Sequence, residues 1–142
     1  MRLLFLIATS ISFAKSIKTS GLDIEIAGIL NSSHASPLGA LFLVYTICLI
    51  LTEILSNNAA AALMYPIAVA YADELKVDYK PFAMVVLFSA SAAFACPTGY
   101  QTHMMVWQPG GYSFFDFVKF GLPIDIIYMI GACLLTPAVW PF

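Results

Sequence analysis

Residues 48–64, CLILTEILSNNAAAALM, place a polar patch inside a long apolar segment. Residues 38–55 are mostly apolar and end in Thr-Glu-Ile-Leu, residues 56–58 are Ser-Asn-Asn, and residues 59–72 are apolar again. Ser and Asn favour the start of a helix because their side-chain oxygens accept hydrogen bonds from its free N–H groups. The stretch therefore predicts two apolar helices joined by a tight polar turn at Ser56.

The whole composition is that of a membrane protein. Of the 142 residues, 61% are hydrophobic and 10% are charged, against about 45–50% and about a quarter in typical globular proteins. So few charges exclude a disordered chain and an ordinary soluble enzyme domain, and the net charge of −2 indicates no nucleic-acid partner. Three cysteines lie far apart without metal or disulfide spacing. We expect one domain, residues 1–142, in a lipid bilayer.

A second apolar segment is also interrupted. Residues 81–95 are apolar, and CPTGYQT follows at residues 96–102. Residues 120–142 contain one acidic residue, Asp125, and predict a spanning helix near the C-terminus. Non-helical backbone at membrane depth is tolerated only against protein or around a water-filled cavity. Two interrupted segments therefore point to the binding site of a transporter, while the charged residues 73–80 predict a loop outside the membrane.

The N-terminal residues allow two interpretations. Residues 1–14 have the basic start, apolar centre and small-residue end of a secretory signal. The alternative is a membrane helix that continues through Lys15 and Lys18 and ends at Gly21. Asp23 and Glu25, among alternating apolar residues, then predict a short amphipathic helix at the membrane interface.

The two interruptions offer neutral groups for binding ions. The helix that starts at Ser56 has free N–H groups and a positive dipole end, which attract anions, whereas the carbonyl end of the preceding helix suits a bare cation. Gly99 lets the backbone approach a ligand, and Gln101 adds an amide. No Lys lies in residues 19–75 or 81–118. A bound sodium ion would offset the charge of the anion, which gives sodium coupling a physical reason.

Several residues have simpler interpretations beside the functional ones. Ser-Asn-Asn also suits an ordinary loop, and Glu53 is either functional within its apolar run or a cap at the boundary. His103 is either a proton acceptor or a polar lining residue. Asp125, counted one turn into the last helix, is expected near the interface. We find no nucleophile–base pair, zinc spacing or paired carboxylates, so the sequence does not indicate an enzyme.

Two motifs resemble one known family. Residues 52–61, TEILSNNAAA, are similar to the second hairpin-tip signature of the divalent anion:sodium symporters, which carry sulfate and dicarboxylates with sodium. Residues 97–102, PTGYQT, and 110–123, GGYSFFDFVKFGLP, resemble the branch that often carries cytosolic TrkA-C-type ligand-sensing domains. His103 departs from the Asn that is usual in that branch. The resemblance extends over nearly the whole chain.

The resemblance implies a fold and a site. The fold is an all-α membrane protein, one inverted-repeat half with a re-entrant helix hairpin and a broken transmembrane helix. The implied sodium ligands are Thr52, Leu55, Asn57 and Gly99. The implied anion-binding residues are Ser56, Asn57, Asn58, Tyr100 and Gln101. Sodium is the coupling ion, and no organic cofactor is implied.

The resemblance also implies partners that the chain lacks. The family's carriers have two such repeats and slide a transport domain past a homodimeric scaffold, whereas residues 1–142 hold only the second tip. We expect a multi-pass part of a cell-membrane carrier that does not transport alone and needs the N-terminal half. Alternatives are an accessory or assembly subunit of a membrane complex, or a related arsenite- or proton-coupled transporter.

Overall fold

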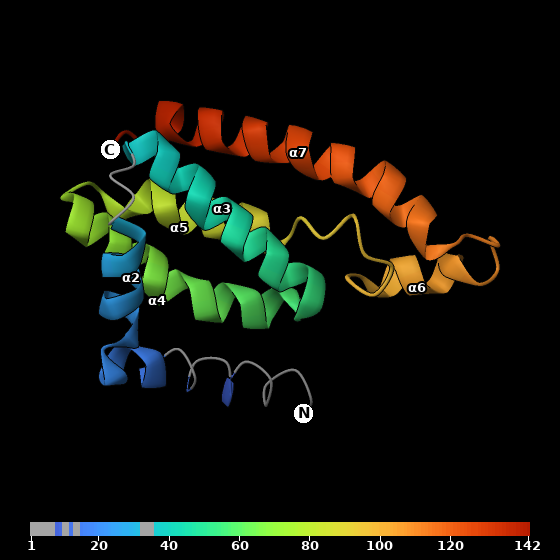
Figure 1. The fold of residues 1–142 in the computed structure, drawn as a ribbon, viewed down its shortest axis with the longest axis horizontal. Coiled ribbons are helices and arrows are strands. Elements are labelled where there is room, and N and C mark those ends of the chain that lie inside the picture. Colours follow the sequence, from blue (N-terminus) through green and yellow to red (C-terminus); the bar gives the residue numbers. More distant parts are fainter. Residues whose placement is uncertain (1–7, 10–11, 13–14, 32–35) are drawn as a thin grey trace.

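The computed structural model describes residues 8–9, 12, 15–31 and 36–142, and α-helix is the regular structure of these residues (Figure 1). After helical residues 15–20, the elements are α2 Leu22–Asn31, α3 Pro37–Ile54, α4 Asn57–Leu75, α5 Tyr79–Ala90, α6 Gln101–Trp107 and α7 Phe114–Val139. The prediction of an all-helical fold is confirmed.

Helices α3 and α4 form the expected hairpin. Ser36 caps α3, where its hydroxyl accepts from the Gly39 N–H at 3.3 Å and Pro37 occupies the first turn. Leu55 leaves the helix with extended backbone, φ −101° and ψ 170°, and Ser56 caps α4. With so short a connection the two helices pack against each other, as the turn predicted at Ser56 requires.

Helix α5 packs against both arms of the hairpin and completes a three-helix group. Its first turn is capped by Asp78, whose carboxylate accepts from the Lys80 N–H at 2.9 Å. The helix ends at Ala90, and residues 91–100, called the broken segment below, are not helical before α6 begins. The predicted interruption of this apolar segment is thus present, but it begins at Ser91, five residues before the polar patch at residues 96–102.

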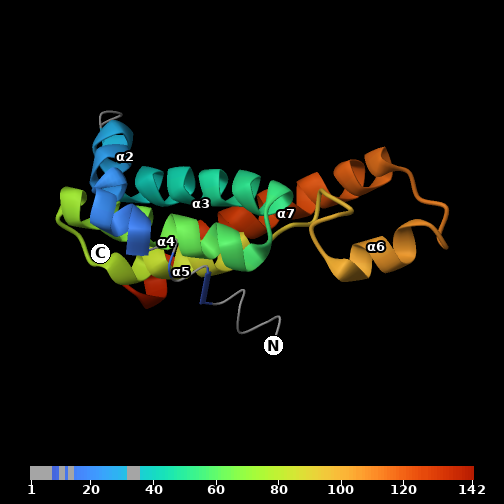
Figure 2. The same ribbon diagram turned by 90° about the horizontal axis from the view of Figure 1, so that it is seen from below.

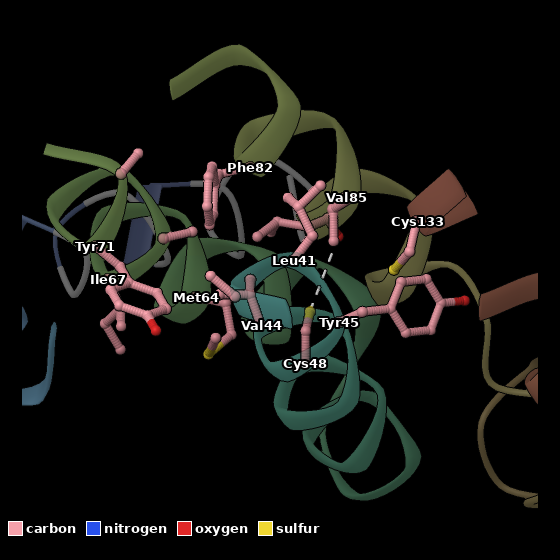
Figure 3. Packing of buried hydrophobic residues seen from close by; sticks show 14 of the residues in the cluster. Leu41, Val44, Tyr45, Cys48, Met64, Ile67, Tyr71, Phe82, Val85 and Cys133 are labelled. Carbon is pink, nitrogen blue, oxygen red and sulfur yellow. Dashed lines mark hydrogen bonds between the residues drawn. The ribbon is translucent and has the colours of Figure 1, made fainter. Parts of the chain in front are cut away.

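The core lies between α3, α4 and α5. Leu41, Val44 and Phe82 are fully buried side chains from this core (Figure 3). Tyr71 meets the Phe82 ring edge-on, with the ring centroids 6.1 Å apart. Such close packing gives the hairpin and α5 a fixed relative position.

Helix α2 packs against α4 and stands at the left end of the molecule, across the direction of α3, in the view of Figure 2. Gly21 has a left-handed φ of 73° and separates α2 from the helical residues 15–20, so the predicted helix end there is confirmed. Within α2, Asp23 is buried and Ile24 is exposed. Most of residues 1–14, which carry the signal-sequence alternative, lie outside the described residues.

Helix α7 crosses the face formed by α3 and α5 (Figure 1). It begins at Phe114, six residues before the predicted start at Phe120. The reason is a cap: the Asp116 carboxylate accepts from the Ser113 N–H at 2.7 Å. Of the described helices, α3 and α7 are long and apolar enough to cross a membrane.

Candidate functional site

The hairpin tip, residues 55–58, presents the start of α4. The Ser56 hydroxyl accepts from the Ala59 N–H at 3.4 Å. Leu55, Ser56 and Asn58 are exposed, whereas Asn57 is half-buried. The tip therefore offers a helix N-terminus with exposed polar side chains and no basic residue, which favours a neutral anion-binding site.

Thr52 ties the tip to the end of α5. Its side chain is fully buried, and its hydroxyl lies 2.7 Å from the Ala90 carbonyl oxygen and 3.0 Å from the Asn57 side-chain amide. One hydroxyl hydrogen serves one acceptor, and the carbonyl can only accept. The atom of Asn57 that faces Thr52 is the amide oxygen Oδ1, which also only accepts, so the Ala90 carbonyl and Asn57 Oδ1 compete for the one hydroxyl hydrogen.

Glu53 reaches further along the broken segment. Its carboxylate oxygen Oε1 accepts from the Ala95 N–H at 3.2 Å, and its Oε2 is buried without a hydrogen-bond partner among the described residues. Glu53 is thus neither a surface residue nor a cap of its own helix. It joins the last turn of α3 to backbone 42 residues later in the chain.

Helix α7 supports the other side of the same backbone. The Asp125 carboxyl lies within reach of the N–H groups of Phe94 and Ala95. Gly121, one turn earlier, has no room for a Cβ atom, which would stand 2.1 Å from the Phe94 carbonyl oxygen. The glycine therefore allows two backbones to touch.

Asp125 does not occupy the position expected from the sequence. It lies about three turns into α7 rather than one, and its side chain is 3% exposed. The capped start of α7 at Phe114 accounts for the difference. Sequence reasoning missed Asp125 and Gly121 as neighbours of the break, although an acidic residue inside an apolar helix was a signal for the first.

The second half of the broken segment leads to α6. The Gly99 N–H donates to the Cys96 carbonyl at 3.2 Å, and the Tyr100 hydroxyl donates to the Ser91 carbonyl. The Nδ1 atom of His103 lies 3.2 Å from the Cys96 carbonyl oxygen, which can only accept, so this nitrogen carries the proton. In this structure the His103 side chain is therefore hydrogen-bonded to the backbone of the broken segment.

The structure brings only some of the predicted site residues into contact. Thr52 and Asn57 meet directly, and Leu55, Ser56 and Asn58 share the tip with them. The contacts between the tip's helix and the break fall at Ala90 and Ala95. Within residues 36–142, no hydrogen bond joins the tip to Gly99, Tyr100 or Gln101, and Gln101 is exposed at the start of α6. Figure 1 shows α6 lying beyond the tip.

The ligands available for a cation are neutral oxygens. Among the described residues, no group of three His, Cys, Asp or Glu side chains could hold a metal ion. Backbone carbonyls, the Thr52 hydroxyl and the Asn57 amide remain, and such hard oxygen ligands suit a cation without covalent preference.

Long apolar helices and a backbone interruption beside a hairpin are features of membrane transport proteins. The sequence model of the family described as "Tripartite ATP-independent periplasmic transporter, DctM component" matches residues 1–138. The chain therefore belongs to this family. The family consists of transporters rather than enzymes, as the sequence predicted.

Curated relatives are also named as transporters. The chain is 40% identical to an uncharacterized transporter of Synechocystis sp. over 139 residues, which cover 96% of the chain and 23% of the relative. It is 35% identical to sodium/sulfate cotransporter 1 of Chlamydomonas reinhardtii over 129 residues, 89% of the chain and 15% of the relative. It is 29% identical to sodium-dependent low-affinity dicarboxylate transporter 1 of Caenorhabditis elegans over 124 residues, 87% and 21%.

The resemblance to sodium/sulfate and dicarboxylate carriers is thus confirmed at the level of the family. The chain spans between 15% and 23% of the length of these relatives. It therefore aligns with a part of each relative.

Proposed function

We propose that this chain takes part in sodium-coupled transport of a divalent anion, sulfate or a dicarboxylate. The observation that carries the proposal is the bond from Thr52 to Ala90 at 2.7 Å, which places a polar helix-hairpin tip beside an interrupted helix. Relatives named as sodium/sulfate and dicarboxylate carriers support the substrate class.

The proposed sodium site uses oxygen atoms near the end of α3. Its members are Thr52, Leu55, Asn57 and Gly99. The fully buried Thr52 hydroxyl and the Asn57 amide already lie 3.0 Å apart, so ordering them for a cation costs little conformational entropy. Leu55 and Gly99 would contribute carbonyl oxygens.

The proposed anion site lies on the exposed side of the same tip. Its members are Ser56, Asn57, Asn58, Tyr100 and Gln101. The N-terminus of α4 supplies free N–H groups and a positive dipole end. Because no Lys or Arg lies within residues 19–75 or 81–118, the sodium ion supplies the positive charge, and each ion lowers the cost of desolvating the other.

The proposal includes the architecture of the complete carrier. The hairpin would be re-entrant, and the chain would be the second of two inverted repeats in a multi-pass, homodimeric cell-membrane protein, close to the branch with TrkA-C-type domains. The chain spans 23% of the length of the Synechocystis relative, which supports its being one part of a longer carrier.

The test is sodium-activated uptake of sulfate and succinate by proteoliposomes containing the chain together with a preceding carrier half. We expect Asn57→Ala to reduce sodium-activated uptake by tenfold or more, because it removes an amide shared by both ions. Gln108→Ala removes an exposed amide from the turn after α6 and should leave uptake unchanged. Full sodium activation in Asn57→Ala would refute the shared site.

The family description favours a second candidate, in which the chain belongs to one component of a transporter with several components. Uptake that requires further protein components, with a fully active Asn57→Ala variant, would favour this candidate. Uptake driven by a proton gradient without sodium would favour a proton-coupled carrier.

A further inference from the structure

Helix α5 ends at Ala90, although the residues that follow it are able to form helix. Residues 91–95 are Ser-Ala-Ala-Phe-Ala, and alanine is the best helix former. The first residue that cannot continue a helix is Pro97, which has no N–H and restricts Cys96 before it. The local sequence therefore permits one more helical turn, and contacts from elsewhere in the fold must prevent it.

Two carbonyl groups that would accept helical hydrogen bonds are occupied by side chains. In a longer α5, the Ala90 and Ser91 carbonyls would accept from residues 94 and 95. In the structure, the Thr52 hydroxyl lies 2.7 Å from the Ala90 oxygen, and the Tyr100 hydroxyl donates to the Ser91 oxygen. Both carbonyls are satisfied without the helix.

The two matching N–H groups are held by carboxylates. The Ala95 N–H donates to Glu53 at 3.2 Å, and the Asp125 carboxyl approaches the N–H groups of Phe94 and Ala95. Two further helical hydrogen bonds would need two carbonyl groups and two N–H groups. All four of these groups instead face side chains from α3, from α7 and from the residue before α6. This arrangement competes directly with one further turn of α5.

The carboxylates are costly in this place. One oxygen of Glu53 and one of Asp125 are buried without a hydrogen-bond partner among the described residues, and the Asp125 side chain is 3% exposed. Neither Glu53 nor Asp125 forms an ion pair within the part of the chain that the structure describes. Glu53 is half-buried with His103 as its basic neighbour, and Asp125 is buried. Carboxyl groups whose oxygens are buried without an ion pair contribute little to the stability of a fold, which favours a functional reason for them.

We propose that Glu53 and Asp125 are positioning residues that hold residues 91–95 out of α5 and keep the broken segment extended beside the hairpin tip. The role rests on the proposed function, because the broken segment forms one wall of the proposed site. Without these acceptors the five residues would join α5 and shorten by up to about 9 Å, since a helix rises about 1.5 Å per residue and extended chain about 3.3 Å. Gly99 would then move relative to the tip.

The test measures this length directly. Nitroxide labels on Lys80→Cys and Thr98→Cys, both at exposed positions, report the span from the start of α5 to the broken segment by pulsed electron paramagnetic resonance. The background variant is Cys96→Ala, and Cys48 and Cys133 are fully buried. Labelling of Cys48 or Cys133 in a variant would show that this variant is misfolded. The comparison then uses the substitution at the other acid, Glu53 or Asp125, which tests the same role.

Two substitutions distinguish the effect of the length of the Glu53 side chain from the effect of its charge. Glu53→Gln keeps the length and an acceptor oxygen without the charge, and we expect the distance distribution of the unsubstituted chain. Glu53→Asp keeps the charge but is one methylene shorter, and we expect a new population shorter by up to about 9 Å. An unshifted Glu53→Asp variant, or a Glu53→Gln variant shifted as far, would overturn the proposal. Asp125→Asn and Asp125→Ala repeat the comparison from α7, with a shift expected for alanine alone.

Transport gives a second readout in the complete carrier. Glu53→Asp should raise the sodium concentration for half-maximal uptake at least fivefold, and Glu53→Gln should restore it to within twofold. A distance shift without any sodium-dependent uptake in the unsubstituted carrier would reject the proposed function and leave the positioning role standing. Sodium-dependent uptake in the unsubstituted carrier, without a distance shift in Glu53→Asp, would support the proposed function and reject the positioning role.

Discussion

Thr52 and Glu53 are neighbours that bind backbone groups of opposite polarity. The Thr52 hydroxyl faces the carbonyl of Ala90, and the Glu53 carboxylate faces the N–H of Ala95. Buried backbone donors and acceptors each need a partner, and a chain that leaves a helix exposes both kinds. This pair of residues therefore supplies one partner of each kind from a single helix end.

Gly121 offers a residue-scale prediction about the contact between α7 and the broken segment. In Gly121→Ala the new Cβ would stand 2.1 Å from the Phe94 carbonyl oxygen, so the two backbones must separate. We expect a loss of roughly 1–3 kcal/mol of stability, measured by thermal unfolding in detergent micelles.

Gly131→Ala is the control for that prediction. Gly131 lies in the same helix, and a Cβ there meets no atom within 4 Å. Alanine should stabilise the helix at this position by roughly 0.5–1 kcal/mol. Equal destabilisation by the two substitutions would contradict the close contact at Gly121.

At the scale of elements, the hairpin could be predicted and the break could be predicted only in part. The turn at Ser56 is determined by the residues of the turn itself, because the cap is a local interaction with Ala59. The end of α5 depends on Glu53 and Asp125, which are distant in sequence. A segment rich in alanine gives no local signal of such a break, so the sequence placed the interruption at residues 96–102 and not at Ser91.

The site shows the same division between local and distant causes. Ser56, Asn57 and Asn58 were found because they follow one another at a helix start. The contact of Thr52 with Ala90 joins residues 38 positions apart, and no periodicity in the chain encodes it. The predicted proximity of the tip to Gly99 and Gln101 stays a prediction.

The first turn of α5 provides an element-scale prediction about pH. The Lys80 N–H bound to the Asp78 carboxylate, with the nearby Lys80 ammonium, holds the pKa of Asp78 below its usual value. A carboxyl whose folded pKa lies below its unfolded pKa stabilises above the unfolded value, and this stabilisation is lost as pH falls through the folded pKa. We expect faster amide hydrogen exchange at the start of α5 on acidification from about pH 6 to about pH 2, after correction for intrinsic rates.

Asp78→Asn is the matched variant for that experiment. Asparagine keeps a capping oxygen for the Lys80 N–H but does not titrate. The corrected exchange at the start of α5 should then be independent of pH in this range. The same acid dependence in both chains would show that Asp78 is not its source.

At the scale of the whole molecule, the apolar surface shows how much the chain leaves uncovered. Helix α7 contacts α3 and α5 along one side, yet Ile127 is 70% exposed and Leu135 is 67% exposed. Composition predicted this membrane class because sixty-one per cent hydrophobic residues exceed what a core of this size can bury. Substrate identity has no such compositional signature, since sulfate and dicarboxylates present the same kind of paired negative charge.

The last prediction concerns the chain reconstituted by itself. It carries one hairpin tip and one broken segment, whereas the proposed carrier encloses its ions with two of each. A site built from half of its ligands binds an anion too weakly to repay the desolvation of both ions. We expect liposomes containing only residues 1–142 to show no sodium-dependent sulfate or succinate uptake above protein-free liposomes, and co-reconstitution with a preceding carrier half to restore it. Sodium-dependent uptake by the single polypeptide would mean that one tip and one break are enough, and the two-repeat proposal would have to be abandoned.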